Sequence, residues 1–179
     1  MCDAFAYLCT KDNIVLKREM VVSVLLLVLF GSSISVWKYS GKPKSGGYKR
    51  GNWSFQSSNS PLSDAVLGWY TGINGNATDV DHVVALKDAY LSGGDSWDLS
   101  QKKIFANDPL HHVAAVPYVN QTLKSAFGPL KFITKLRNSS YVFANGKCED
   151  YIDLSVQVKK KYGLNFRNNQ IDTAKVACH

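Results

Sequence analysis

Cysteine is scarce in this 179-residue sequence: there are four, and none belongs to a CxxC pair or to a Cys/His cluster. A structural zinc site, which is typically built from such clusters, is therefore not expected. No internal repeat is visible and nothing marks a second domain boundary, so one domain with an N-terminal tail is expected. Apolar residues at 45% and charged residues at 20% exclude a collagen-like, low-complexity or wholly disordered chain.

Acidic residues are also few, since 14 Asp and Glu face 21 Lys and Arg and give a formal charge of +7. Residues 1–37 carry three charges of each sign, so the whole excess belongs to the globular part. A basic balance of this size favours polyanionic partners such as nucleic acid or anionic lipid, although a merely solvated surface gives the same number.

A long apolar run occurs near the N-terminus, in residues 21–37, and Lys17 and Arg18 precede it. A basic flank, a short apolar stretch and then small residues indicate a signal peptide or a short signal anchor, because a spanning helix wants about 20 apolar residues. Residues 1–37 are thus an expected leader, with Met20 as an alternative start. The protein is then secreted, or anchored to a membrane through this segment only.

The rest of the chain predicts an α+β fold, with a Lys-, Gly- and Ser-rich linker at 38–50 and a globular domain at 51–179. A β-branched segment that begins at Asp79 and another at 110–116 predict two strands. Apolar periodicity and caps, among them Ser96, Gly163 and Asn168, predict helices around this small hairpin. These helices are expected at 87–91, 97–105, 118–127, 130–136, 149–163 and 168–177.

Two cysteines, Cys148 and Cys178, bracket the last two predicted helices. A disulfide between them closes a C-terminal helical hairpin and suits an oxidising compartment, whereas two free buried thiols are the alternative.

One short segment, Asp79-Val80-Asp81-His82, concentrates groups that can do chemistry. Alternation along a strand places the two acids on one face and His82 on the other. A hard divalent cation prefers carboxylate and amide oxygens, which Asp81 and Asn120 can supply, and His82 can serve as a general base. Taken alone the segment is a weak signal, because an ordinary strand histidine explains it equally well.

The surrounding blocks are more specific. The stretch DVDHVVALKDAYLSGGDSW…FANDPLHHVAAVPYVNQ…GP, over residues 79–129, resembles HNH endonucleases of the ββα-metal superfamily. It is most similar to a secreted bacterial and fungal subfamily, and its DVDH start resembles the HNH domain of CRISPR effector nucleases. Similarity extends upstream over Tyr48, Arg50 and Trp53, and downstream over Lys161 to Leu164 with a cysteine at each end of the hairpin. The resemblance implies a ββα-metal core.

The resemblance also implies roles, position by position. The metal-binding acid falls on Asp81 and the general base on His82. His111 stands where the subfamily has an asparagine that braces the hairpin and orients the base, and so belongs to the catalytic set. A second metal ligand falls on Asn120. The resemblance assigns no role to Asp79, which we expect to support these groups or to cap the strand end rather than to bind the metal directly.

The implied cofactor is one Mg²⁺ or Mn²⁺ ion, and the implied substrate is DNA, with RNA as the alternative. No base-reading motif is visible in the sequence, so little sequence specificity is expected. Lys102, Lys103 and Lys124 are expected to contact phosphates; Lys124 stands one residue beyond the Lys of the subfamily's NRSKG block, whose Arg is lost. A monomer is expected, with an inhibitor protein as a further partner. The alternative is a non-catalytic, exported or membrane-tethered basic module that binds nucleic acid.

Overall fold

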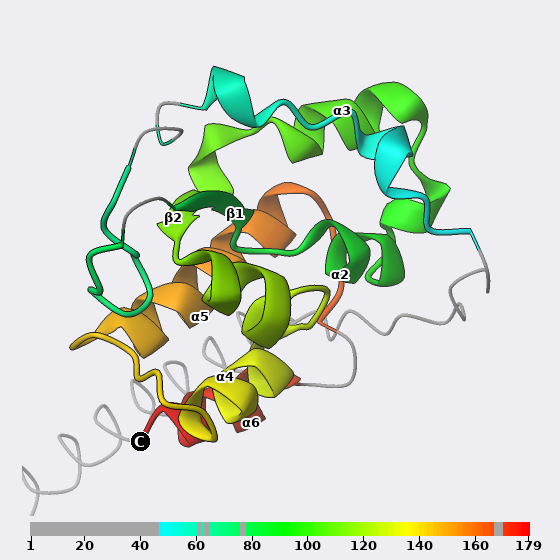
Figure 1. The fold of residues 1–179 in the computed structure, drawn as a ribbon. Helices are drawn as coiled ribbons and strands as arrows, with labels where there is room; N and C mark the ends of the chain where they lie inside the picture. The colour runs from blue at the N-terminus through cyan, green and yellow to red at the C-terminus, as the bar shows by residue number, and fades with distance from the viewer. Residues whose placement is uncertain (1–46, 61, 63–64, 76–77, 167–169) are drawn as a thin grey trace, which may run out of the picture. The chain divides into compact units, whose positions relative to one another are not determined.

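A two-stranded antiparallel sheet lies at the centre of the computed structural model (Figure 1). β1 (Asp79–His82) pairs with β2 (His112–Ala115) in a register that sets Asp79 opposite Ala115 and His82 opposite His112. Both predicted strands are confirmed. β2 is shorter than predicted because a 3-10 turn, Pro109–His111, takes the first residues of the segment.

The structure describes residues 47–60, 62, 65–75, 78–166 and 170–179. The predicted leader and residues 38–46 of the predicted linker lie outside this set. Within it, no helix is both long and apolar enough to cross a membrane.

Helices surround the sheet, so the mixed α+β architecture is confirmed. In Figure 1, α3 lies to one side of the strands and α4 and α6 lie to the other. The helices are α2 (Leu86–Leu91), α3 (Leu99–Ala106), a π-helix (Val119–Lys124), α4 (Pro129–Arg137), α5 (Lys147–Lys161) and α6 (Gln170–Cys178), with 3-10 turns at Arg50–Trp53, Ser57–Asn59, Gly94–Ser96 and Pro109–His111.

Two of the predicted helix boundaries were wrong. α3 begins after Asp98, whose side chain accepts from the Gln101 N–H in a reciprocal capping box, rather than after Ser96. Ser96 instead donates its hydroxyl to the Gly93 carbonyl and closes a separate 3-10 turn. The predicted helix at 118–127 is a short π-helix that stops at Ser125, where φ is 43°.

The C-terminal hairpin follows the prediction closely. α5 ends in a Schellman arrangement, in which Gly163 at φ 63° and Leu164 donate their N–H groups to Lys160 and Lys159. The Cys148–Cys178 disulfide joins the start of α5 to the end of α6 and is confirmed. The predicted cap Asn168 lies outside the described residues.

Two apolar clusters flank the sheet. One gathers side chains of β2, the π-helix, α4 and α5, with Tyr70, Phe132 and Tyr151 fully buried. The other gathers α2, α3 and the end of α5 around Trp53 and Phe105. The strands are therefore held from both sides, and the polar groups at their ends are fixed in place.

Candidate active site

The acidic face of β1 lies against the π-helix. Asn120 donates its amide to Asp79 Oδ2 at 3.0 Å, and Gln121 donates to the same oxygen at 2.9 Å. One turn further along the helix, the Lys124 ammonium contacts Asp81. The structure thus pairs Asn120 with Asp79, whereas the resemblance pairs it with Asp81 around a metal ion.

Asp81 is 4% exposed and both of its carboxylate oxygens have partners. Tyr70 donates its hydroxyl to Oδ2 at 2.7 Å, and Lys124 Nζ lies 3.2 Å from Oδ1 and 3.1 Å from Oδ2. Burial raises the pKa of Asp81, although the Lys124 charge and the Tyr70 hydrogen bond oppose the rise. This carboxylate ties β1 to the π-helix and to Tyr70.

The structure corrects two of the three lysines predicted to contact phosphate. Lys124 is fully buried, and Lys102 is only 9% exposed, with its ammonium on the Trp97 carbonyl. Both side chains satisfy internal acceptors and are not available to a backbone phosphate. Lys103, on the outer side of α3, is exposed and stays a candidate.

His82 points away from the acids, as strand alternation predicts. Its Nε2 lies 2.7 Å from the Ala106 carbonyl, and a carbonyl only accepts, so Nε2 carries the proton and Nδ1 is left with the lone pair. Burial first, and then the neighbouring imidazoles of His111 and His112, lower its pKa well below the ordinary value. The ring is therefore neutral at ordinary pH, as a general base must be to accept a proton, while the lowered pKa makes it a weaker base.

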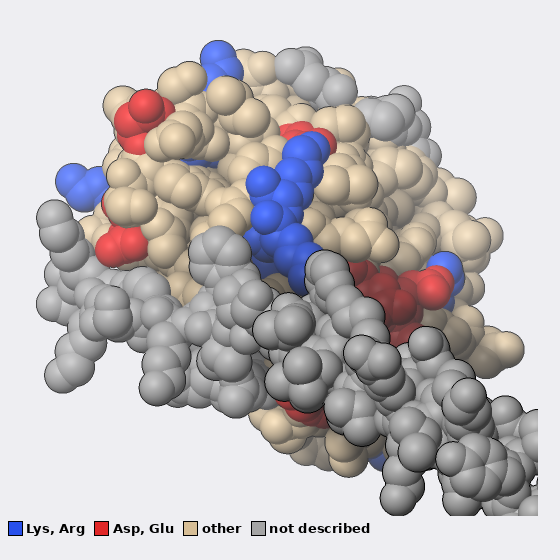
Figure 2. Space-filling model, turned by 180° about the vertical axis from the view of Figure 1, so that it is seen from behind, with Lys and Arg blue, Asp and Glu red and all other residues tan. Residues whose placement is uncertain are grey.

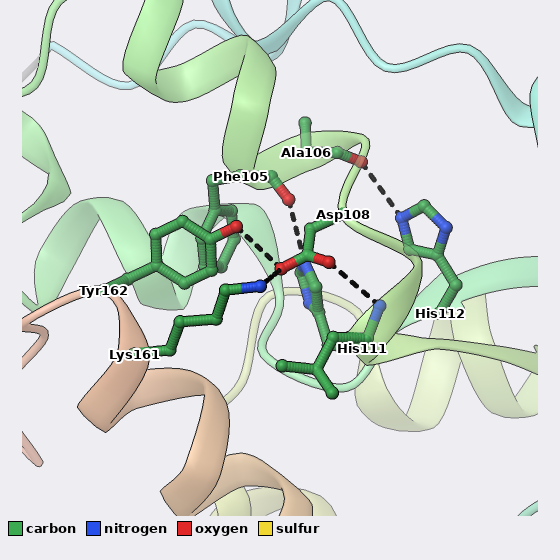
Figure 3. Close-up of polar contacts among 8 residues, drawn as sticks. Phe105, Ala106, Asp108, His111, His112, Lys161 and Tyr162 are labelled. Atoms are coloured by element: carbon green, nitrogen blue, oxygen red, sulfur yellow. Dashed lines mark hydrogen bonds and ion pairs between the residues drawn. The ribbon is translucent and has the colours of Figure 1, made fainter.

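The last two residues of α3, Phe105 and Ala106, supply the carbonyls that hold these imidazoles, and Figure 3 shows their bonds to His111 and His112. His111, fully buried, donates Nε2 to the Phe105 carbonyl at 2.8 Å, and His112 donates to the Ala106 carbonyl at 3.1 Å. His111, directly before β2, is tied to the end of α3 by its hydrogen bond. Its Nδ1 and that of His112 are buried without a hydrogen-bond partner.

Asp108 lies in the loop that joins α3 to β2, and it anchors this loop to the end of α5. Lys161 and Tyr162 reach its Oδ2 at 2.6 and 2.7 Å, and the Leu110 N–H donates to Oδ1 at 3.0 Å (Figure 3). Partial burial raises the pKa of Asp108, but the hydrogen bonds from Lys161 and Tyr162 outweigh it and bring the pKa to about 2. The carboxylate is thus ionised under all ordinary conditions.

A pocket of about 860 Å³ opens beside β1. Its polar wall carries one carboxylate, two carboxamides and two cations: Asp79, Asn120, Gln121, Arg50 and Lys87. Phe55 also lines the pocket, and its ring lies edge-on to the His82 imidazole with 4.4 Å between centroids. His82 therefore lies directly behind an aromatic side chain of the pocket wall.

Several of these partners were missed by sequence reasoning. Tyr70, Phe55 and Gln121 contact predicted site residues, yet each carries no local signal, because its role arises only from tertiary packing. Tyr162 and Lys161 belong to the downstream block of the resemblance, and their pairing with the Asp of the NDP turn could have been proposed from it.

Comparisons with known proteins give one relative. A stretch of 90 residues is 36% identical to a protein of Arthroderma benhamiae named "Uncharacterized secreted protein". The match covers 48% of this chain and 44% of the relative, so the chain spans less than half of the relative's length. No family model and no solved structure matches the chain. The HNH resemblance accordingly stays a prediction.

Proposed function

We propose that the protein hydrolyses phosphodiester bonds of nucleic acid as an HNH-type endonuclease, with His82 as the general base. The observation that carries this proposal is the His82 imidazole, neutral and anchored through Nε2 to the Ala106 carbonyl, on a strand beside a polar pocket. The pairing of β1 with β2 and the π-helix that follows β2 also support a ββα arrangement, in which α2 and α3 are inserted between the two strands.

In the proposed reaction, His82 Nδ1 takes a proton from a water molecule, whose oxygen forms a bond to phosphorus. The bond from phosphorus to the 3′ oxygen breaks, and that oxygen takes up a proton from solvent. Arg50 and Lys87 supply positive charge in the pocket for the phosphate. Because Phe55 lines the pocket and its ring packs on His82, we propose that the Phe55 ring turns aside in the reaction.

The Mg²⁺ or Mn²⁺ ion that the resemblance implies does not fit at Asp81 as the structure builds it, because the Lys124 ammonium already contacts both carboxylate oxygens. Among the described residues, no three His, Cys, Asp or Glu side chains are grouped to hold a metal ion. Asp79 with the carboxamides of Asn120 and Gln121 is a donor set that suits a hard cation, since either amide can present its oxygen after a flip. An ion bound by these groups would stabilise the negative charge of the phosphate.

A second function is favoured by a specific observation. Asp81 is neutralised by a buried lysine, and the His82 ring is packed against Phe55. A module that only binds nucleic acid does not need either side chain to be accessible. On the side of the molecule hidden in Figure 1, Lys and Arg side chains gather in one stripe (Figure 2). A basic stripe of this kind attracts the phosphate backbone without catalysis.

We propose an extracellular location. The relative is named as a secreted protein, and the Cys148–Cys178 disulfide is typical of an oxidising compartment. Anchoring through residues 21–37 falls outside the described residues and stays a prediction.

Cleavage and binding assays on the purified protein separate the two functions. Supercoiled plasmid and single-stranded RNA are incubated with Mg²⁺, with Mn²⁺ and with chelator, and binding to the same substrates is measured by gel shift. Nicked or shortened products support the nuclease, whereas tight, salt-dependent binding with intact substrate under all three conditions supports the binding module and contradicts the nuclease.

A further inference from the structure

Lys124 is fully buried near the proposed site, and oxygen atoms surround its ammonium as they would surround a bound metal ion. Its ammonium lies 3.2 Å from Asp81 Oδ1 and 3.1 Å from Asp81 Oδ2, and it also donates to the His82 carbonyl. Three oxygen contacts match the three donors of a lysine ammonium. Tyr70 takes the remaining hydrogen-bonding position on Oδ2.

We infer that the Lys124 ammonium is the resident cation of Asp81, and that this carboxylate therefore binds no divalent metal ion in the native protein. The inference concerns ion binding, and does not rest on the proposed catalysis. It assigns Asp81 a structural role and leaves Asp79 as the carboxylate that faces the pocket.

The charge of the buried site supports this assignment. Asp81 and Lys124 together are neutral, and both side chains are 5% exposed or less. A divalent ion added to the pair leaves two uncompensated positive charges in a region shielded from water, which is strongly unfavourable. An ion can therefore bind Asp81 only if Lys124, whose side chain has no exposed surface, first leaves.

The local backbone explains how Lys124 reaches this place. The helix from Val119 to Lys124 is wound as a π-helix and ends abruptly at Ser125, whose φ is 43°. The sequence has one residue more between Asn120 and this lysine than the NRSKG block has. The wider π turn accommodates it, so that Asn120 meets Asp79 while Lys124 meets Asp81.

Mn²⁺ titration, followed by electron paramagnetic resonance, tests the inference on folded protein without reference to cleavage. Asp81→Asn keeps an oxygen for Lys124 and Tyr70, and we expect it to leave the Mn²⁺ affinity within about twofold of the native value. Asp79→Asn is the matched control and is expected to weaken any native Mn²⁺ site by about tenfold or more, the loss typical of a disturbed metal site.

Removal of the lysine provides the second arm. Lys124→Ala is expected to create one additional Mn²⁺ site, which disappears in the double variant Lys124→Ala/Asp81→Asn. If the alanine variant does not fold, Lys124→Met replaces it, because methionine fills most of the buried volume and donates no hydrogen bond to Asp81. Loss of native Mn²⁺ binding in folded Asp81→Asn overturns the inference, as does the absence of a new site in a folded Lys124 variant. Failure of the nuclease proposal leaves both readouts unchanged.

Discussion

At the scale of single residues, access to His82 depends on the Phe55 ring. Phe55 lines the pocket and also lies edge-on to His112, with 5.4 Å between centroids. The backbone around it is anchored separately, since the Gln56 N–H donates to Asn107 and the Asn107 amide donates to the Ser54 carbonyl, both at 3.1 Å. These hydrogen bonds hold the backbone on both sides of Phe55.

Phe55→Ala is expected to expose His82 to the pocket. Modification of His82 by diethyl pyrocarbonate, followed by mass spectrometry, should be faster in the variant than in the native protein. The unfolding free energy should fall by about 1–3 kcal/mol, below the cost of a fully buried Phe, because the ring is partly exposed. Phe127→Ala is the control, as its ring lies under Lys131 and Lys135. An unchanged modification rate in folded Phe55→Ala contradicts the gating role.

At the scale of elements, sequence patterns predicted those element ends that depend only on neighbouring residues. The start of β1 at Asp79 and the end of α5 before Gly163 follow from β-branched residues and from a glycine at positive φ. The burial of Lys124 could not be predicted, because a lysine in a polar helix reads as a surface residue until Asp81 is placed opposite it. Ser96 and Asp98 are both favourable N-cap residues, and the capping box with Gln101 makes Asp98 the N-cap of α3.

A second buried ion pair joins α2 to α5. Lys159 Nζ lies 2.7 Å from Asp88 Oδ2, both side chains are nearly inaccessible, and the same ammonium donates to the Ser92 hydroxyl at 2.9 Å. Lys159→Met is expected to lower the unfolding free energy by roughly 3–5 kcal/mol, because a buried carboxylate loses its cation.

Lys147→Met is the matched control for this pair. Lys147 contacts Asp150 at the same distance of 2.7 Å, but both side chains are substantially exposed, so a change below about 1 kcal/mol is expected. Urea denaturation of both variants measures the difference. Equal losses of unfolding free energy in the two variants contradict the claim that burial makes the Asp88–Lys159 pair more important for stability.

At the scale of the whole molecule, three neutral imidazoles make the fold sensitive to acid. Burial lowers the pKa of His111 to about 4 despite its hydrogen bond to Phe105, and the pKa values of His82 and His112 are lowered too. In the unfolded chain each ring takes up its proton near pH 6.5. The unfolded state thus binds more protons between about pH 6.5 and 4.

The unfolding free energy is therefore expected to fall as the pH drops through this range. His111 alone accounts for a loss of roughly 3 kcal/mol, at about 1.4 kcal/mol for each pKa unit, and the raised pKa of Asp81 offsets part of it. Urea midpoints between about pH 7 and pH 4 measure the slope. His111→Asn, which removes one imidazole, should flatten it; the same slope in both proteins contradicts the assignment.

The central claim, that His82 is the base for phosphodiester hydrolysis, is tested most directly by His82→Gln. Glutamine can still donate to the Ala106 carbonyl but cannot accept the proton from water, and His179→Ala, at an exposed position, is the control. The single-turnover cleavage rate of plasmid is measured at equal bound fraction. We predict a fall of about 10²–10⁴-fold for His82→Gln with plasmid binding retained and no change for His179→Ala. Equal rates for the native protein and His82→Gln contradict the claim.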